Sequence, residues 1–374
     1  MRVSFRIIIS VLMFLTIACC DSNRNDIYSR VSNGFKSIRP ASSWEEALVT
    51  GNGTMGAMVM GYPYSDTIII NHALLYLPLN RPIKPISQGA HLDSIRAIML
   101  RGDYGKASQY VVGLSQDEGY GAKRWTDPFI PAFQIVISMK RDSVTGYSRQ
   151  VNFETGEAGV QWRDRNGTFT RNTFVSRKDN LVITRISSDN SKISCKISLH
   201  NRHLYDWWER IDKRDSTCIR PASITASENT ITYSADFTNH WEGMITGYEG
   251  GTMVLNEGGS ITDDGTTISV TDATGILLLA WVDPLWDGSG HHEEERIAEI
   301  RKGITDYNDY LKKHVGIHSE LINRVSLNLG GDPKFRDKPV EEILREVNEK
   351  PDPALFELAF NAARYNIISA TGIN

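Results

Sequence analysis

The sequence has little of what nucleic-acid-binding and metal-binding proteins need. Its 41 Lys and Arg are outnumbered by 45 Asp and Glu, and no stripe of basic residues is interleaved with aromatics, so we expect no nucleic-acid interface. Four cysteines in 374 residues, with no Cys-x-x-Cys motif, give neither a zinc knuckle nor a disulfide scaffold. We therefore predict no metal ion and no cofactor.

Other catalytic and ligand-binding patterns are also absent. Gly51, Gly53 and Gly56 are not followed by Lys-Ser or Lys-Thr, which argues against a phosphate loop. His314 and His318 have a spacing that can hold zinc on a helix, but the rest of that face is apolar, so we predict buried structural histidines. The neighbouring acids of Glu293–Glu295 and of Glu45–Glu46 cannot face each other across a substrate. We expect these acids to be solvated surface charge, and the adjacent His291 and His292 to diverge.

The longest apolar run, Ile7 to Ala18, is too short to span a membrane. It follows Arg2 and Arg6 and has the length of a secretory signal core, so residues 1–18 are predicted to be a signal peptide. The run ends in Leu-Thr-Ile-Ala-Cys-Cys, which is similar to the lipobox of bacterial lipoproteins, with Cys19 as the favoured lipidated residue and Cys20 as the alternative. We expect an exported, membrane-anchored lipoprotein facing the periplasm or cell surface. A cleaved signal without lipid, or an uncleaved anchor, is the alternative.

Polar residues 19–40 are predicted to form a flexible tether. The other two cysteines are Cys195 and Cys218. Cys195 falls in the alternation Ile193, Cys195, Ile197, Leu199, which places it on the core face of a strand. We favour a buried free thiol over a disulfide with Cys218.

From residue 133 to 283 the chain reads as closely spaced strands with turn signals and no helices between them, which predicts an antiparallel sandwich. Helical periodicity follows, and we predict a helical linker over residues 288–350. A last helix begins at Asp352-Pro353, an N-cap followed by proline at the first helical position. Its expected apolar face lacks an evident partner and comprises Leu355, Leu358, Ala359, Ala362, Tyr365 and Ile368.

The stretch from Trp44 to Tyr76 carries the most informative motif of the sequence. Glycines at 51, 53 and 56 permit a tight turn between buried strands. Here the sequence resembles the N-terminal domain of glycoside hydrolase family 95, the inverting α-L-fucosidases, on Trp44, Gly51-Asn52-Gly53, Gly56-Ala57 and Ile70-Asn71. The resemblance continues in order through Tyr147–Thr155, Phe169–Ser176 and Leu355–Ser369.

The resemblance implies a mainly β fold: a large two-sheet super-sandwich over 41–287, then the start of an incomplete (α/α)6 catalytic barrel over 351–374. An inverting glycosidase needs a carboxylic acid and an activated water on opposite faces of the sugar, with carboxyl groups about 6.5–9.5 Å apart. In the family these groups lie on the later barrel, and no residue of this chain matches them. We therefore assign no catalytic residue and expect the chain to be inactive alone.

Six residues are candidates for substrate contact. Asn71 and His72 follow a strand and can project toward a barrel mouth, with a satisfied turn pair as the plain structural alternative. Trp125 and Asp127 belong to an extended loop fixed by two prolines, which could instead be a packed loop without ligand. Aromatic rings stack on the apolar faces of sugars, which makes Trp207 and Trp208 candidates, although buried aromatics are the commoner case.

Three functional hypotheses follow. The first is the N-terminal part of an exported, fucosidase-like glycoside hydrolase acting on an α-L-fucosylated or related glycan. The second is a stand-alone carbohydrate-binding sandwich at the cell surface. The third keeps the enzyme family but changes the sugar to an α-L-galactoside, which differs from a fucoside by a hydroxyl at C6.

Overall fold

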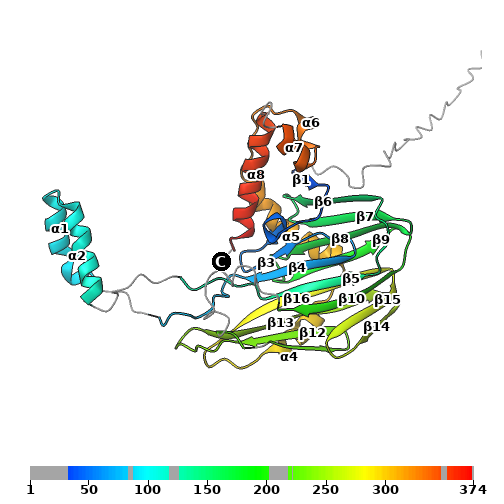
Figure 1. The fold of residues 1–374 in the computed structure, drawn as a ribbon, viewed down its shortest axis with the longest axis horizontal. Coiled ribbons are helices and arrows are strands. Elements are labelled where there is room, and N and C mark those ends of the chain that lie inside the picture. The colour runs from blue at the N-terminus through cyan, green and yellow to red at the C-terminus, as the bar shows by residue number, and fades with distance from the viewer. Residues whose placement is uncertain are drawn as a thin grey trace, which may run out of the picture.

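The computed structural model describes residues 33–82, 87–117, 126–201, 218–220, 222–346 and 352–372. Within them the protein is a sandwich of two antiparallel sheets, one of nine strands and one of seven, followed by helices (Figure 1). The predicted fold class, mainly β with a two-sheet sandwich and trailing helices, is confirmed. The alternating apolar residues of the strands meet between the sheets and form the main core.

The nine-stranded sheet carries the outer helices. In spatial order its strands are β1 (Gly34–Ser37), β6 (Gly146–Asn152), β7 (Ala158–Asp164), β8 (Gly167–Val175), β9 (Val182–Ser188), β16 (Gly275–Trp286), β13 (Ile245–Glu257), β12 (Thr230–Asp236) and β11 (Ser223–Ser227).

The seven-stranded sheet contains the glycine-rich stretch. Its order is β14 (Ser260–Asp263), β15 (Thr267–Ala273), β10 (Ile193–His200), β5 (Phe133–Met139), β4 (Ser65–His72), β3 (Met55–Val59) and β2 (Leu48–Gly51). The predicted turn between two buried strands is the β2–β3 hairpin, in which Gly51 pairs with Gly56.

Several strand predictions need correction. Strand β1 lies inside the segment predicted to be a tether, because Phe35 packs near Phe153 at a ring distance of 6.1 Å and the strand pairs with β6. Strands β11 and β14 were not predicted. Alternation in the sequence predicts separate strands at 242–248 and 252–255. The structure has instead the single strand β13, whose Gly250 and Gly251 continue the pairing with β16.

Cys195 is a buried free thiol, so the prediction for it is confirmed. Cys218 is also buried. Cys195 lies in the core on β10, and burial raises the pKa of its thiol to about 12.

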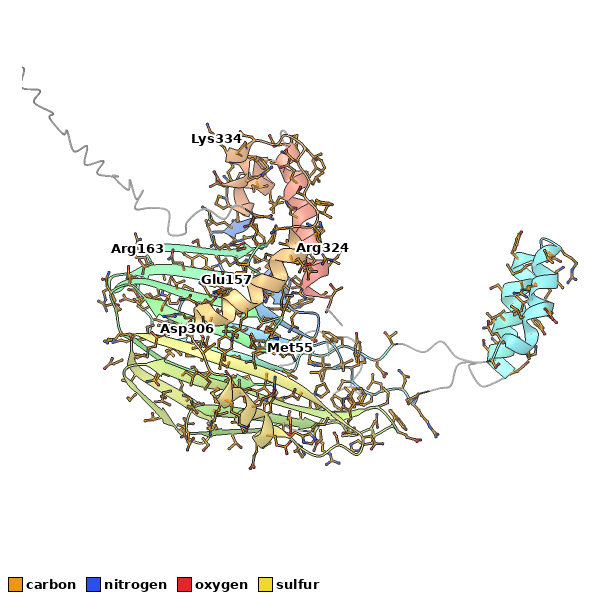
Figure 2. The ribbon with its side chains drawn as sticks, turned by 180° about the vertical axis from the view of Figure 1, so that it is seen from behind. Met55, Glu157, Arg163, Asp306, Arg324 and Lys334 are labelled. Carbon is orange, nitrogen blue, oxygen red and sulfur yellow. The ribbon has the colours of Figure 1, made fainter. Side chains whose placement is uncertain are left out.

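Helices α4 (Glu293–Lys302) and α5 (Tyr307–Ile322) cover the outer face of the nine-stranded sheet. Figure 2 shows α5 crossing this face. Strand β16 is covered on one face by the other sheet and on the other face by these helices. Most of its residues are therefore buried, without the alternation of a half-exposed strand. Apolar residues at helical spacing in the sequence predict a helix over 305–329, and α5 is shorter because it ends at Ile322.

The last helices stand at one end of the sandwich. They are α6 (Pro333–Arg336), α7 (Val340–Glu346) and α8 (Pro353–Ser369). As predicted, Asp352 caps α8 by accepting a hydrogen bond from the Ala354 N–H at 2.8 Å.

Helices α1 (Leu92–Leu100) and α2 (Tyr104–Asp117) form an arm that stands away from the sandwich (Figure 1). Two short 3-10 helices, Trp44–Glu46 and Gly89–His91, complete the described elements.

A buried ion pair joins the two sheets. Asp66 on β4 lies 2.6 Å from the Arg171 guanidinium on β8, and both side chains are 0% exposed. The other oxygen of Asp66 accepts hydrogen bonds from the N–H groups of Gly61 and Tyr62. The Arg171 guanidinium also lies over the Trp162 ring at 5.2 Å. A charge in this position is tolerated only while its partner remains.

Replacing Arg171 with Met should lower the free energy of unfolding by ~3–5 kcal/mol, because Asp66 is left buried without a cation. Adding Asp66→Asn should recover part of that loss, since a neutral amide oxygen can still accept from the two backbone N–H groups. Urea unfolding of the single and double variants measures both effects.

The control is an exposed pair, Lys196 and Asp264, with a nitrogen–oxygen distance of 3.0 Å. Lys196→Met should cost less than about 1 kcal/mol because water screens this pair. If Arg171→Met lowered the free energy of unfolding by as little as Lys196→Met does, the buried ion pair would not be what holds the two sheets together.

Candidate functional site

The first candidate region is the rim, defined as residues 71–82 and 126–132, where β4 ends. His72 is buried, and its Nδ1 accepts a hydrogen bond from the Leu74 N–H at 3.2 Å. Burial lowers the pKa of His72 to about 4, so the ring is neutral at pH 7. Asn71 is half-buried on β4 opposite Gly56. His72 therefore holds the turn after β4. Asn71 and His72 both stay candidates for ligand contact.

The two chain segments of the rim run antiparallel and are joined by backbone hydrogen bonds. Asp127 accepts from the backbone and side-chain amides of Asn80 at 3.0 and 2.7 Å. Beside it, the rings of Tyr76 and Phe129 lie 5.2 Å apart and are 46% and 43% exposed. The rim thus combines an exposed aromatic pair with a carboxylate, which is a suitable surface for a sugar.

Three predicted contact residues, Trp125, Trp207 and Trp208, lie outside the described residues, as does the predicted lipidation site Cys19. The structure therefore places Asn71 and His72 at one end of the rim and Asp127, beside Asn80, at the other. It does not describe the three tryptophans.

The second region is the junction, defined as the turn Gly51–Thr54, Gly156, Arg177, His314, His318 and the end of α8. Asn52 organises the turn. Its side-chain oxygen accepts from the N–H groups of Thr54 and Met55 at 2.9 and 2.8 Å. Its amide donates to the Ser176 carbonyl and to Asn180 Oδ1, both at 2.9 Å. The turn also touches the rim, since the Ala73 N–H donates to the Thr54 carbonyl at 2.8 Å.

The C-terminal end of α8 rests directly on this turn. The Gly53 N–H donates to the Ser369 carbonyl at 3.0 Å. Gly53 has φ +88°, and a Cβ there would lie 1.9 Å from the Gly372 nitrogen. At Gly51 a Cβ would lie 2.5 Å from the Ser369 oxygen. The glycines are therefore required by the close approach of α8 as well as by the turn.

Arg177 completes the cap of α8. Its guanidinium donates to the carbonyl of Ile368 and to that of Thr371, the latter at 3.1 Å. The last carbonyls of a helix lack intrahelical partners and carry partial negative charge, which a cation stabilises. The sandwich thus supplies both an N–H donor and a cation to the end of α8.

The histidine pair of α5 orients Arg177. The Arg177 backbone N–H donates to His314 Nδ1 at 3.1 Å, and Arg177 Nε donates to His318 Nδ1 at 3.5 Å. His318 Nε2 lies 2.9 Å from the Phe153 carbonyl and is the donor there. Both rings must be neutral for this arrangement. Burial lowers the pKa of His314 to about 3 and that of His318 to about 4.

These histidines are buried and serve the packing, as predicted. Their rings stack at 5.1 Å, and His318 meets the edge of Tyr365 at 5.9 Å. Tyr365 stacks on Phe153 at 4.9 Å and donates to the Val49 carbonyl at 2.8 Å.

Most of the α8 face expected to lack a partner is in fact packed, and Ala359 is its exposed exception. Leu358, Ala362, Tyr365 and Ile368 join the main core, while Leu355 packs with α6 and α7. Its uncovered face lies elsewhere and includes Phe356 and Ile367.

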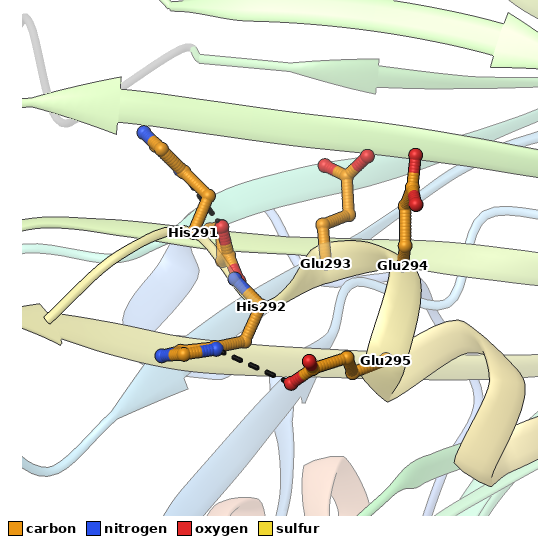
Figure 3. Close-up of a pocket in the computed structure, with 6 residues that line it drawn as sticks. His291, His292, Glu293, Glu294 and Glu295 are labelled. Carbon is orange, nitrogen blue, oxygen red and sulfur yellow. Dashed lines mark hydrogen bonds and ion pairs between the residues drawn. The ribbon is translucent and has the colours of Figure 1, made fainter.

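A pocket of about 410 Å³ lies at the start of α4 and contains the acids noted in the sequence (Figure 3). Glu249 of β13 is 1% exposed and accepts from the His292 N–H at 2.8 Å and pairs with His291 Nδ1 at 3.0 Å. His292 turns the other way, toward Glu295 at 3.3 Å. Glu249 therefore anchors the first turn of α4. Burial, with Glu249 next in effect, raises the pKa of Glu293.

Within the described ranges, no group of three or more His, Cys, Asp or Glu side chains could hold a metal ion. The same described ranges contain no helix that is long and apolar enough to cross a bilayer.

Comparison with known proteins matches two family models. Residues 36–288 match "Glycosyl hydrolase family 65, N-terminal domain", and residues 306–372 match "Glycosyl hydrolase family 95 catalytic domain". The chain is 24% identical to "Alpha-L-fucosidase 2" of Arabidopsis thaliana, over 96% of this chain and 46% of the relative. It is 21% identical to "Probable alpha-fucosidase A" of Aspergillus niger, over 87% of this chain and 41% of the relative.

The solved structure titled "Putative kojibiose phosphorylase from human microbiome" is similar at a TM-score of 0.48 and 10% identity, over 90% of this chain and 41% of the other. The chain spans less than half the length of the two curated relatives.

The sandwich and the helices that follow it define a module of carbohydrate-active enzymes. The chain belongs to the glycosyl hydrolases, with the family 65 type of N-terminal domain followed by a stretch of the family 95 catalytic domain. The resemblance drawn from the sequence is confirmed.

The sequence interpretation missed two functional residues of this region. Arg177 directly follows the family-like segment Phe169–Ser176, and a single arginine gives no signal of its own. Glu249 is a charged residue within the buried strand β13. That placement could have revealed it, because buried carboxylates require partners.

Gly53→Ala should force the end of α8 off the turn, because its new Cβ would overlap Gly372. We expect a loss of unfolding free energy larger than the ~1–2 kcal/mol of left-handed strain alone, together with faster amide hydrogen exchange in α8.

Gly102→Ala is the matched control, since Gly102 has φ +83° and no atom within 4 Å of the added Cβ. Gly102→Ala should lower the free energy of unfolding only by the backbone strain, and it should leave amide hydrogen exchange in α8 unchanged. Equal effects of the two substitutions would show that the contact with α8 is not what requires glycine at 53.

Proposed function

We propose that this chain is the N-terminal part of an exported glycoside hydrolase acting on α-L-fucosides, in which the sandwich holds the first helices of the catalytic domain in position. One observation carries the proposal. Helix α8 lies within the stretch matched by the catalytic-domain model, and its end is held by Gly53 and Arg177 of the sandwich. The names of the curated relatives support fucose as the sugar. The domain limits predicted at 41–287, 288–350 and 351–374 remain part of the proposal.

The proposed chemistry is hydrolysis with inversion, which needs opposed acid and base groups about 6.5–9.5 Å apart across the sugar. The carboxylates gathered in the pocket at α4 do not suit this task. One turn of α4 carries the three consecutive acids Glu293, Glu294 and Glu295, so they do not face each other. Glu249 already accepts a hydrogen bond from the N–H of His292 at the start of α4. In the proposal the catalytic groups belong to the part of the catalytic domain outside residues 33–372, so this chain alone does not turn over substrate.

A second candidate function is glycan binding by the sandwich itself. The observation in its favour is the exposed pair of Tyr76 and Phe129 beside Asp127. On this account the chain binds a fucosylated glycan at the rim without cleaving it.

The isolated chain should release no L-fucose from 2′-fucosyllactose. A chimera that joins residues 33–372 to the remaining catalytic part of the Arabidopsis relative should release it, with the β anomer as first product by NMR. The chimera should act less on an aryl α-L-galactoside, whose extra C6 hydroxyl must be accommodated.

Fucose release by the isolated chain would contradict the proposal. Saturable binding of the glycan by the isolated chain with no turnover, lost in Tyr76→Ala, would favour the binding function. A chimera active only on the galactoside would favour the third hypothesis, an α-L-galactosidase of the same family.

We propose further that the protein is a lipoprotein anchored through Cys19, on the pattern of the first twenty residues. Cells expressing the full chain should incorporate labelled palmitate into it, and Cys19→Ala should abolish that label and release the protein from the membrane fraction. Label that persists in this variant but disappears in Cys20→Ala would move the anchor by one residue, and no label in either would refute it.

A further inference from the structure

Asparagine followed by glycine occurs three times in the sequence, at residues 33–34, 52–53 and 166–167. In this dipeptide the asparagine side chain can lose its amide without an enzyme, because glycine has no Cβ to keep its backbone nitrogen away from the side chain. The nitrogen attacks the side-chain carbonyl carbon, a succinimide ring closes, and the amide nitrogen leaves as ammonia. Water then opens the ring to aspartate or to isoaspartate.

The junction holds both reacting groups of the pair Asn52 and Gly53. Asn52 is 7% exposed, and its amide donates to the Ser176 carbonyl and to Asn180 Oδ1, both at 2.9 Å. Its side-chain oxygen accepts from two backbone N–H groups of the turn. The attacking nitrogen is the backbone nitrogen of Gly53, whose N–H donates to the Ser369 carbonyl at 3.0 Å. Neither group can move toward the other while these hydrogen bonds last.

The end of α8 also leaves no space for the reaction. A Cβ added to Gly53 would lie 1.9 Å from the Gly372 nitrogen and 2.1 Å from the Thr371 carbonyl carbon. The ring intermediate needs the Gly53 nitrogen to lose its hydrogen and turn to Asn52, which requires the end of α8 to leave. Asn52 can therefore react only in molecules in which the junction is open.

The pair Asn166 and Gly167 is an internal reference. It belongs to the turn between β7 and β8, where Asp164 pairs with Gly167, and Asn166 is exposed. The Asn166 amide donates to Asp142 at 3.1 Å on the surface. The atoms nearest to a Cβ added at Gly167 belong to side chains of residues 188–190 and not to a helix end. This pair needs no opening of the junction to react.

Conversion of Asn52 would keep the junction from closing again. A carboxylate has no N–H to donate to the Ser176 carbonyl or to Asn180 Oδ1, and it would face these two acceptors with a buried negative charge. It would also attract the Arg177 guanidinium, which lies 3.5 Å from the Asn52 carbonyl oxygen and binds the last carbonyls of α8. Isoaspartate would lengthen the main chain by one carbon in a turn that α8 covers closely.

We propose that Asn52 is a deamidation site that the end of α8 keeps closed. When the junction opens, the Gly53 nitrogen displaces the Asn52 amide, and the resulting aspartate or isoaspartate makes the opening permanent. Water is the co-reactant, and ammonia is the product that leaves. The site thus distinguishes molecules whose α8 has stayed docked from molecules that have opened, whatever sugar the complete enzyme acts on.

Incubation of the unmodified chain in mildly alkaline buffer, followed by peptide mass mapping and isoaspartate-specific methylation, measures the conversion of both asparagines. Asn52 should convert at least ~100-fold more slowly than Asn166, because it reacts only from the open fraction. Arg177→Gln removes the cation that holds α8, so it should speed the conversion of Asn52 at least ~10-fold and leave the rate at Asn166 unchanged.

A urea series on the unmodified chain is a second measurement that does not depend on the folding of Arg177→Gln. The rate at Asn52 should rise with urea in step with amide hydrogen exchange in α8, while the rate at Asn166 changes little. Asn52→Asp imitates the product and should speed amide exchange in α8 at least ~10-fold. Asn166→Asp is the matched control and should leave that exchange unchanged.

Three results would overturn the inference. The first is conversion of Asn52 as fast as that of Asn166 in the unmodified chain. The second is a rate at Asn52 that rises neither in Arg177→Gln nor in urea. The third is an Asn52→Asp variant whose α8 amides exchange as slowly as those of the unmodified chain.

Discussion

The end of α8 is held by two groups of the sandwich, the N–H of Gly53 and the guanidinium of Arg177. The other contacts of the junction are arranged around them. Helix ends leave carbonyls without partners, and burying such an end requires donors from elsewhere. Here the donors come from a β-hairpin turn and from the residue after Ser176, so a helix late in the sequence is fixed by strands that begin the domain.

The neutral histidines follow from this constraint. His314 and His318 fix the backbone and the Nε of Arg177 by accepting hydrogen bonds at Nδ1, while its guanidinium reaches the carbonyls at the end of α8. If either histidine ring were protonated, its Nδ1 would carry a hydrogen and could no longer accept from Arg177, and its positive charge would repel the Arg177 guanidinium. Burial depresses both histidine pKa values and keeps the rings neutral. The i, i+4 spacing that could have suggested zinc instead places two acceptors on one face of α5.

The sandwich could be predicted because its signals are local. Alternation along strands such as β10, and turn glycines such as Gly53, fix strand and hairpin from neighbouring residues alone. Strand β1 was missed because four residues in a polar stretch show no period. The covered face of α8 was assigned correctly as apolar but wrongly as unpartnered, because its partners, Phe153 and the β2 backbone, are about two hundred or more residues away in sequence.

These contacts make the sandwich and α8 one cooperative unit. Native-state hydrogen exchange of the unmodified chain in increasing denaturant tests it most directly. The amides around Tyr365 should open at the same free energy as those of β8, and their exchange should merge with global unfolding. Opening of α8 at a much lower free energy, while β8 stays protected, would contradict the claim that the junction joins the two.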